Sequence, residues 1–468
     1  MKLKKIAFFC IPAHGHTNPM LPVAAELVRR GNIVRFYSFD KFETKIKATN
    51  AEFVSCDRFL PELTKQEEAG LKKVSSTEMT IQDIRITLNM DSFLSEEFAA
   101  FQPDVVYTDA VCFWGKLNAW KHKVPLVVSV STFAFNQLSS QYMKNSPKEM
   151  ADMIFGLPRI SKELEKLKPF GYHVNNALSL VQNDNSTDSV VYTSKFFQPY
   201  AESFSDHYAF VGPSVFSKAR PQKTKERPLI YISMGTVVND LPDFYRKCIE
   251  ALKDLKVDVI ISCGQNMEKK IPDKLPDNIK AYPYVDQLDI LSKADVFITH
   301  CGMNSVSESL YMAAPMVLYP QTNEQAAVAR RVTEINTGIL LQTDTVAGIK
   351  AAVEEILGNA SYAQNAEACS KDFRNCPGTA GAAEFIENAP HPSAGRDLLA
   401  ELHIQSGKAQ GIYWAIAAIL MIPVGLLIGW RFVWMIGVAA GVLSYPIGQI
   451  MQRKIYQKIT GTLGENHA

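Results

Sequence analysis

The stretch Tyr284–Gln325 reads YVDQLDILSKADVFITHCGMNSVSESLYMAAPMVLYPQTNEQ, and it decides the fold. Its apolar, β-branched run Asp295–Thr299 is typical of a buried parallel strand, and Pro315–Pro320 is expected to be the next one. Between them, His300-Cys301-Gly302 ends the first strand, and a helix is expected to start near Asn304. A strand, a turn, a helix and a second strand in this order predict an α/β fold with a parallel sheet.

The turn between that strand and that helix is suited to binding an anion. Free N–H groups and the positive end of the dipole at a helix N-terminus both favour negative charge. His300, Asn304 and Ser305 add side-chain donors there. Glu308, one turn further on, is placed to accept hydrogen bonds from a ribose. Ser305 and Glu308 also fit a capping box that needs no ligand, and this alternative stays open for the pair.

The same stretch resembles the donor-binding signature of the UDP-dependent glycosyltransferases. That signature runs from an aromatic residue and Gln, through HCGxNSxxE, to an acidic residue and Gln. The matching residues here are Tyr284, Gln287, His300, Cys301, Gly302, Asn304, Ser305, Glu308, Glu324 and Gln325. The resemblance implies that His300, Asn304 and Ser305 bind the diphosphate and that Glu308 binds the ribose. It also implies that Glu324 and Gln325 bind the sugar hydroxyls and that Tyr284 stacks on the base.

Gly235 and Thr236, in the turn after the expected strand Leu229–Ser233, complete the predicted donor site. Three residues depart from the pattern of the family. Tyr284 stands where the plant branch has Trp, Asp286 stands where Pro is usual, and Glu324 stands where Asp is commoner. These departures bear on the identity of the sugar more than on uridine, and UDP-glucose is the expected donor by resemblance alone.

A candidate general base lies in the first strand-to-helix loop. Gly15-His16 falls in this loop, and Asp109 ends the later expected strand Pro103–Asp109. Parallel-sheet geometry can bring these loops together, and a His hydrogen-bonded to an Asp suits proton abstraction from an acceptor hydroxyl. The catalytic loop of the family has the sequence pattern HGHxNP, which matches His14–Pro19. By that match His16 is the base, Asp109 is its partner and His14 is structural. One displacement at C1 implies inversion, and this scheme requires no metal or other cofactor.

Composition limits the other classes of function. Charged residues make up 21% of the 468 residues and the net charge is +1, which argues against nucleic acid as a partner. The eight Cys form no CxxC pair and no cluster with zinc spacing, so reduced thiols in a cytosolic compartment are expected. The N-terminal apolar run is short and ends at a His-rich turn, so it is interpreted as a first strand rather than a signal peptide.

The order of expected strands and helices predicts two Rossmann-like domains facing across a cleft, the glycosyltransferase-B arrangement. The expected first strand, Lys5–Ile11, is followed by a helix Met20–Arg30 with Asn18 as N-cap and Pro19 at its first position. Residues of roughly 55–100 suit either a helical lid over an acceptor or a plain packing helix. We expect these domains and segments: acceptor domain 1–216, linker 217–228, UDP-sugar domain with closing helices 229–390, linker 391–410, membrane anchor 411–452 and basic cytoplasmic tail 453–468.

The C-terminal region is not explained by the family resemblance. Gly411–Gly429 and Phe432–Gln452 carry no charge, and each is close to the ~20 residues that span a ~30 Å hydrocarbon core. Tryptophans lie near the ends of these runs, and basic residues flank the pair on both sides. We expect a two-helix hairpin in the lipid bilayer with both ends in the cytoplasm. An apolar globular domain is the alternative.

Together these features predict a membrane-anchored, inverting UDP-sugar hexosyltransferase that acts on a small lipophilic acceptor at the cytoplasmic face of the cell membrane. Two alternatives remain. One is a membrane glycolipid synthase of the same fold. The other is a non-catalytic scaffold that partners an active enzyme, although a scaffold has no need to keep His16, Asp109 and the whole donor set together.

Overall fold

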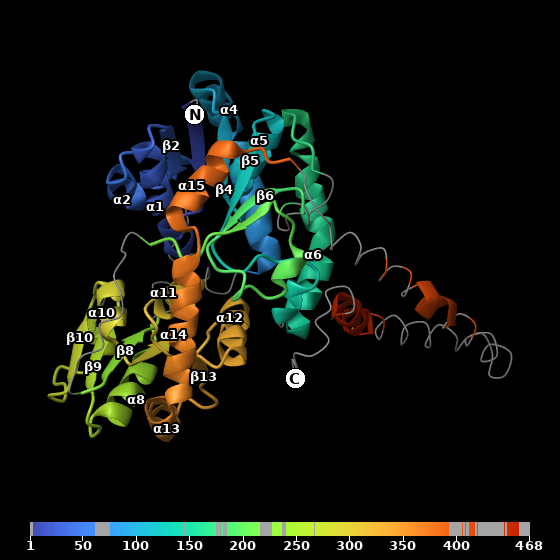
Figure 1. Ribbon diagram of the computed structural model, residues 1–468. Coiled ribbons are helices and arrows are strands. Elements are labelled where there is room, and N and C mark those ends of the chain that lie inside the picture. The colour runs from blue at the N-terminus through green and yellow to red at the C-terminus, as the bar shows by residue number, and fades with distance from the viewer. Residues whose placement is uncertain are drawn as a thin grey trace.

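The computed structural model of the chain contains two parallel sheets, one in each half (Figure 1). This confirms the predicted two-domain α/β class. The structure describes residues 3–60, 75–143, 146–174, 180, 185–215, 227–235, 240–265 and 267–392, with 405, 408, 411–416, 419, 444 and 447–457 nearer the C-terminus. Most of the two predicted linkers, 217–228 and 391–410, lies outside these residues.

The N-terminal sheet has seven parallel strands in the order β3-β2-β1-β4-β5-β6-β7. Its strands are β1 Lys5–Phe9, β2 Ile33–Ser38, β3 Glu52–Ser55, β4 Val105–Asp109, β5 Leu126–Val130, β6 Asp188–Val191 and β7 Tyr208–Phe210. The inner strand β1 is apolar and fully buried from Ile6 to Phe9. Helices on both faces of a parallel sheet exclude water from its strands. The strand sequences are therefore continuous hydrophobic runs.

The helices of this half are α1 His14–Arg29, α2 Glu43–Lys47, α4 Ser76–Phe101, α5 Phe113–Lys121 and α6 Pro147–Glu165, with short 3₁₀ turns between them. The long helix α4 occupies much of the region 55–100, for which a helical lid and a packing helix were both expected. It begins at a Ser75 cap that accepts a hydrogen bond from the Glu78 backbone N–H, and it ends at Gln102 in the left-handed conformation. Residues 61–74 lie outside the described part.

The predicted start of the first helix is wrong. We expected Asn18 as the N-cap, whereas α1 begins one turn earlier, with Ala13 as an N-cap that makes no side-chain hydrogen bond. Pro19 and Pro22 lie inside the helix. A proline fits a first helical position well, which made Pro19 a plausible start. The earlier turn is stabilised by backbone bonds such as that from Thr17 N–H to the Ala13 carbonyl oxygen, 2.9 Å.

The C-terminal sheet has six parallel strands in the order β10-β9-β8-β11-β12-β13. They are β8 Leu229–Ser233, β9 Asp258–Ser262, β10 Ile279–Tyr282, β11 Val296–Thr299, β12 Met316–Leu318 and β13 Gly338–Leu340. Its helices are α8 Pro242–Leu252, α9 Met267–Lys270, α10 Gln287–Lys293, α11 Met303–Tyr311, α12 Asn323–Glu334 and α13 Val346–Gly358. The quoted stretch therefore forms α10, β11, α11, β12 and the start of α12.

Two closing helices, α14 Ala360–Asn375 and α15 Gly378–Asn388, run from the C-terminal half back onto the N-terminal half (Figure 1). Glu387 of α15 accepts hydrogen bonds from Arg30 at 3.0 Å and from Asn32 at 2.6 Å. The Lys4 ammonium donates to the Ala389 carbonyl oxygen at 2.9 Å. These contacts bind the end of the second half to the first sheet and fix the cleft between them.

The predicted membrane hairpin, 411–452, lies largely outside the described residues. The parts that are described include helical residues 411–416 and a helix over 447–457. The second of these packs on the N-terminal half: Arg453 donates to Gln141 at 2.5 Å, and the rings of Tyr456 and Tyr200 meet edge to face at 5.2 Å. Among the helices that the structure describes, none has the length and apolar character that crossing a bilayer requires.

Candidate active site

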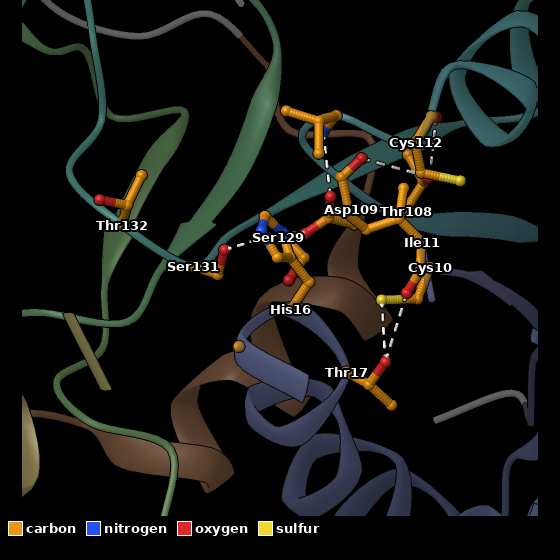
Figure 2. Close-up of polar contacts among 12 residues, drawn as sticks. Cys10, Ile11, His16, Thr17, Thr108, Asp109, Cys112, Ser129, Ser131 and Thr132 are labelled. Carbon is orange, nitrogen blue, oxygen red and sulfur yellow. Dashed lines mark hydrogen bonds and ion pairs between the residues drawn. The ribbon is translucent and has the colours of Figure 1, made fainter. Parts of the chain in front are cut away.

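His16 and Asp109 meet at the carboxyl ends of the N-terminal strands (Figure 2). The Asp109 side chain, fully buried at the end of β4, lies 2.8 Å from His16 Nδ1 through Oδ2 and accepts the Val111 backbone N–H through Oδ1. A carboxylate can only accept, so Nδ1 carries the proton. The lone pair is then on His16 Nε2. This nitrogen has no hydrogen-bond partner among the residues that the structure describes.

The electrostatics of His16 are set by opposing influences. Burial lowers the pKa of the imidazole, but the charge of Asp109 and its hydrogen bond raise it, and Glu324 adds to the rise. The net result is a pKa above the ordinary value of 6.5. His14 differs: its ring packs edge to face on Phe42 at 4.9 Å, and its pKa is lowered. Among the residues that the structure describes, His16 contacts a carboxylate and His14 does not.

Ser131 lies at the end of β5 and was not predicted as a site residue. Its hydroxyl oxygen is 3.2 Å from His16 Nδ1, so the ring is held by the ends of two neighbouring strands (Figure 2). The next residue, Thr132, donates to Glu324 of the other half at 2.8 Å. From the sequence, Ser131 was expected to belong to the strand and Thr132 had no predicted role. Small polar residues at a strand end have no distinctive spacing that would identify them. The position after a buried strand was the one available signal.

His300 follows β11 and is held between two glycines. A Cβ atom on Gly235 would lie 2.5 Å from the ring, and one on Gly302 would lie 2.6 Å from its Nε2. Burial lowers the pKa of His300 to about 4, so the ring is neutral at physiological pH. Its Nδ1 is buried and has no hydrogen-bond partner among the described residues. A neutral imidazole can donate a hydrogen bond to a phosphate oxygen but cannot neutralise its charge. Thr236 lies outside the described residues.

The beginning of α11 differs from the capping-box alternative. Its N-cap is Gly302, and no side chain caps it. Gln287 instead donates to Glu308 at 2.6 Å and to Ser305 at 3.3 Å. Gln287 is itself held by Tyr231, whose hydroxyl lies 3.2 Å from the Gln287 amide oxygen. The capping box is therefore absent, and burial raises the Glu308 pKa to about 7 despite the Gln287 hydrogen bond.

A cavity of about 710 Å³ opens between the two halves beside Glu308. Lys45 and Thr49 line it from the N-terminal half, and Asp286 and Leu288 line it from the C-terminal half. Asp286, one of the departures from the family pattern, also caps α10 by accepting the Asp289 backbone N–H. A space of this size suits a ligand of drug or nucleotide dimensions.

The remaining predicted donor residues lie at the edges of the cleft. Tyr284 is 63% exposed, so its ring face is available to a base. Glu324 and Gln325 are in the first turn of α12. Gln325 accepts from the Gln321 backbone N–H at 2.8 Å, whereas Glu324 reaches Thr132 across the cleft.

Asn304, in the first turn of α11, contacts the N-terminal half directly. Its side-chain amide donates to the Gly15 carbonyl oxygen at 2.9 Å. Gly15 precedes His16, so a residue of the predicted diphosphate site contacts the residue next to the predicted base. The structure thus gathers His16, Asp109, Asn304 and Glu324 at one cleft between the carboxyl ends of two parallel sheets, where ligands of open α/β folds bind.

Known glycosyltransferases are similar to this chain over most of its length. Residues 216–378 match the family described as UDP-glucoronosyl and UDP-glucosyl transferase. NDP-glycosyltransferase YjiC of Bacillus licheniformis is 32% identical over 403 residues, which cover 82% of this chain and 97% of the relative. Demethyllactenocin mycarosyltransferase of Streptomyces fradiae is 27% identical over 84% of this chain and 88% of its own length.

Solved structures show the same architecture. The calicheamicin glycosyltransferase CalG4 superposes with a TM-score of 0.68 at 25% identity, covering 84% of this chain and all of the other. The glycotransferase of kitacinnamycin gives a TM-score of 0.69 at 25% identity over 82% of this chain and 98% of its own.

Proposed function

The chain belongs to the UDP-glycosyltransferase family, and we propose that it moves a hexose, with glucose as the expected sugar, from UDP to a hydroxyl group of a small lipophilic acceptor. It is a glycosyltransferase, which transfers a sugar from a nucleotide-sugar donor to an acceptor. The 2.8 Å contact between His16 and Asp109 supports this proposed reaction. It lies one residue from Gly15, which Asn304 of the C-terminal half contacts.

The proposed reaction is a single displacement. His16 Nε2 takes the proton of the acceptor hydroxyl as the oxygen attacks C1 of the sugar, and the bond from C1 to the diphosphate oxygen breaks. UDP leaves, and the configuration at C1 inverts. Asp109 accepts the hydrogen bond from Nδ1, which orients the ring, and its charge stabilises the imidazolium that forms. The proposal gives His16 the role of general base and Asp109 that of its partner.

The donor half has groups suited to the other side of the bond. The N-terminus of α11 carries the positive end of a helix dipole, and His300 offers a hydrogen bond to a phosphate oxygen. Glu308, which lines the cavity, is proposed to accept from the ribose hydroxyls. Glu324 is proposed to bind the sugar hydroxyls, and its present contact with Thr132 places it beside the acceptor half. Tyr284 supplies an exposed ring for the base.

The place of reaction is proposed to be the cytoplasmic face of the cell membrane. Two uncharged runs with flanking basic residues support a hairpin anchor, and a tethered enzyme meets a lipid-soluble acceptor at raised local concentration. A membrane glycolipid synthase remains the alternative within the same chemistry. The non-catalytic scaffold loses support, because the relatives that match most of the chain are named as glycosyltransferases.

The first test measures UDP release from a panel of UDP-sugars with a phenolic acceptor. We expect release with UDP-glucose, and we expect His16→Ala to lower kcat by about 100- to 10,000-fold, the usual worth of a general base. His14→Ala is the matched control from the same loop, and it should retain most of the activity. UDP release that survives His16→Ala would exclude His16 as the base.

A further inference from the structure

The first turn of α1 contains a backbone acceptor that its own helix cannot satisfy in the ordinary way. In an α-helix the carbonyl oxygen of one residue accepts from the N–H four residues later. The residue four positions after Gly15 is Pro19, which lies inside α1 and has no N–H. The Gly15 carbonyl oxygen, directly before His16, therefore lacks its usual donor. Gly15 is exposed, so its oxygen is open to a donor from another part of the molecule.

The partner comes from the opposite half of the molecule. The Asn304 amide nitrogen donates to the Gly15 oxygen at 2.9 Å across 289 positions of sequence. A primary amide carries two N–H donors, and Gly15 accepts one of them. No described residue is recorded as a partner of the other donor. Asn304 is the second residue of α11, so its free donor lies at the helix end where the diphosphate is expected.

His16 is thus fixed from two directions. Its ring is held at Nδ1 by Asp109 and Ser131, which belong to the N-terminal half. The peptide before it is held by Asn304, which belongs to the donor half. The position of His16 therefore depends on contacts from both halves, and the Asn304 contact joins the halves at the residue next to His16.

We propose that Asn304 is a positioning residue that bridges the leaving diphosphate, through one N–H, and the Gly15 carbonyl, through the other. Pro19 favours the bridge because it removes the helical donor that would compete for the same oxygen. Donor binding then fixes the helix that carries the base. This inference rests on the proposed function, in which His16 is the base and the diphosphate binds at α11.

The test is a double-mutant cycle on the full-length chain with Pro19→Ala and Asn304→Ala. Pro19→Ala supplies an N–H to Gly15 and draws its oxygen away from Asn304. We expect kcat to fall about 3- to 10-fold, the effect of one hydrogen bond, with little change in the KM of the acceptor. In the Asn304→Ala background the same substitution should cost nothing further, because the bridge is already absent.

The matched control is Pro158→Ala, which restores an N–H inside α6 at an exposed position, where no contact from Asn304 is affected. It should remain within twofold of the native kcat. Alanine favours a helix over proline, so both variants should unfold at or above the native temperature, and a folding defect can be recognised by that measurement.

Three outcomes decide the matter. A loss in Pro19→Ala that disappears in the Asn304→Ala background supports the bridge. A Pro19→Ala enzyme equal to the native one, or losses that add independently, overturns it while leaving the role of His16 intact. Full activity in His16→Ala would instead overturn the proposed base, and the bridge with it.

Discussion

At His16, the charge of Asp109 and the effect of burial act on one imidazole in opposite directions. The raised pKa means that the unprotonated base is lost as pH falls through a value above 6.5. We expect kcat to decline on the acid side with that apparent pKa. Asp109→Asn removes the larger raising influence and leaves burial with the weaker influence of Glu324, so the acid limb should move to lower pH while the plateau falls about 100-fold. A pH–rate profile of the two enzymes measures both effects. An unmoved acid limb would show that another group governs it.

At Glu308, the pKa of about 7 leaves the carboxyl group partly protonated in the free enzyme. A ribose hydroxyl donates best to the ionised form, so UDP binding should lower this pKa and release a proton. The affinity for UDP should therefore rise with pH through neutrality. Calorimetry at pH 6.5 in buffers of different ionisation heat measures the released proton. Glu308→Gln should abolish the release from this residue and weaken UDP binding about tenfold or more, because a charge-assisted hydrogen bond is lost.

UDP itself titrates near the same pH, so the comparison of native and Glu308→Gln chains isolates the contribution of the protein. Equal proton release in the two chains would contradict the assignment of Glu308 to the ribose.

Among the elements, the turn after β8 determines where His300 lies. Gly235 has φ +76°, a conformation that costs an L-residue about 1–2 kcal/mol, and a Cβ there would come within 2.5 Å of the imidazole. Gly235→Ala should lower the unfolding temperature and weaken UDP binding, because the ring must move off the helix end. Gly358→Ala is the control, since a Cβ at Gly358 meets no atom within 4 Å. Differential scanning fluorimetry with and without UDP reports both changes. A native-like UDP shift in Gly235→Ala would show that the ring can move without consequence.

Local patterns predicted the elements that carry most of the site. The donor stretch is contiguous, so strand, glycine turn and helix could be identified together, and Asp109 was found because it ends an apolar strand. Contacts between distant segments could not be predicted in this way. The Asn304 contact uses a backbone oxygen 289 positions away, and Thr132 has no pattern that distinguishes it from other strand ends. The start of α1 was misplaced because a proline inside a helix resembles one at its first position.

For the whole molecule, the two halves meet through polar contacts that surround the cleft. Tyr142 donates to Glu334 at 2.6 Å, and Arg331 donates to the Phe196 carbonyl oxygen at 2.6 Å. The helix over 447–457 packs beside these contacts, on Gln141 and Tyr200. Residues 447–457 thus lie against the N-terminal half, which holds the proposed acceptor site. An anchor attached there would hold the acceptor half nearest to the lipid.

The position of His391 shows where the C-terminal region can be removed. Its backbone N–H and its ring nitrogen both lie within 3.1 Å of the buried Asp188 carboxylate. A chain that ends at Pro392 keeps this contact and both sheets. We expect it to glycosylate a water-soluble phenol within about threefold of the native rate, because the cleft is unchanged. With an acceptor embedded in liposomes it should lose at least about tenfold, because tethering raises effective concentration by that factor or more.

Substituting Arg453 and Tyr456 by alanine separates docking from anchoring, because these variants keep both uncharged runs and lose the contacts with Gln141 and Tyr200. If the membrane anchor is what matters, they should retain transfer to the liposome-borne acceptor while the chain ending at Pro392 loses it. If all of these chains lose activity on both acceptors alike, the C-terminal region supports the acceptor half itself, and the proposed membrane role is wrong.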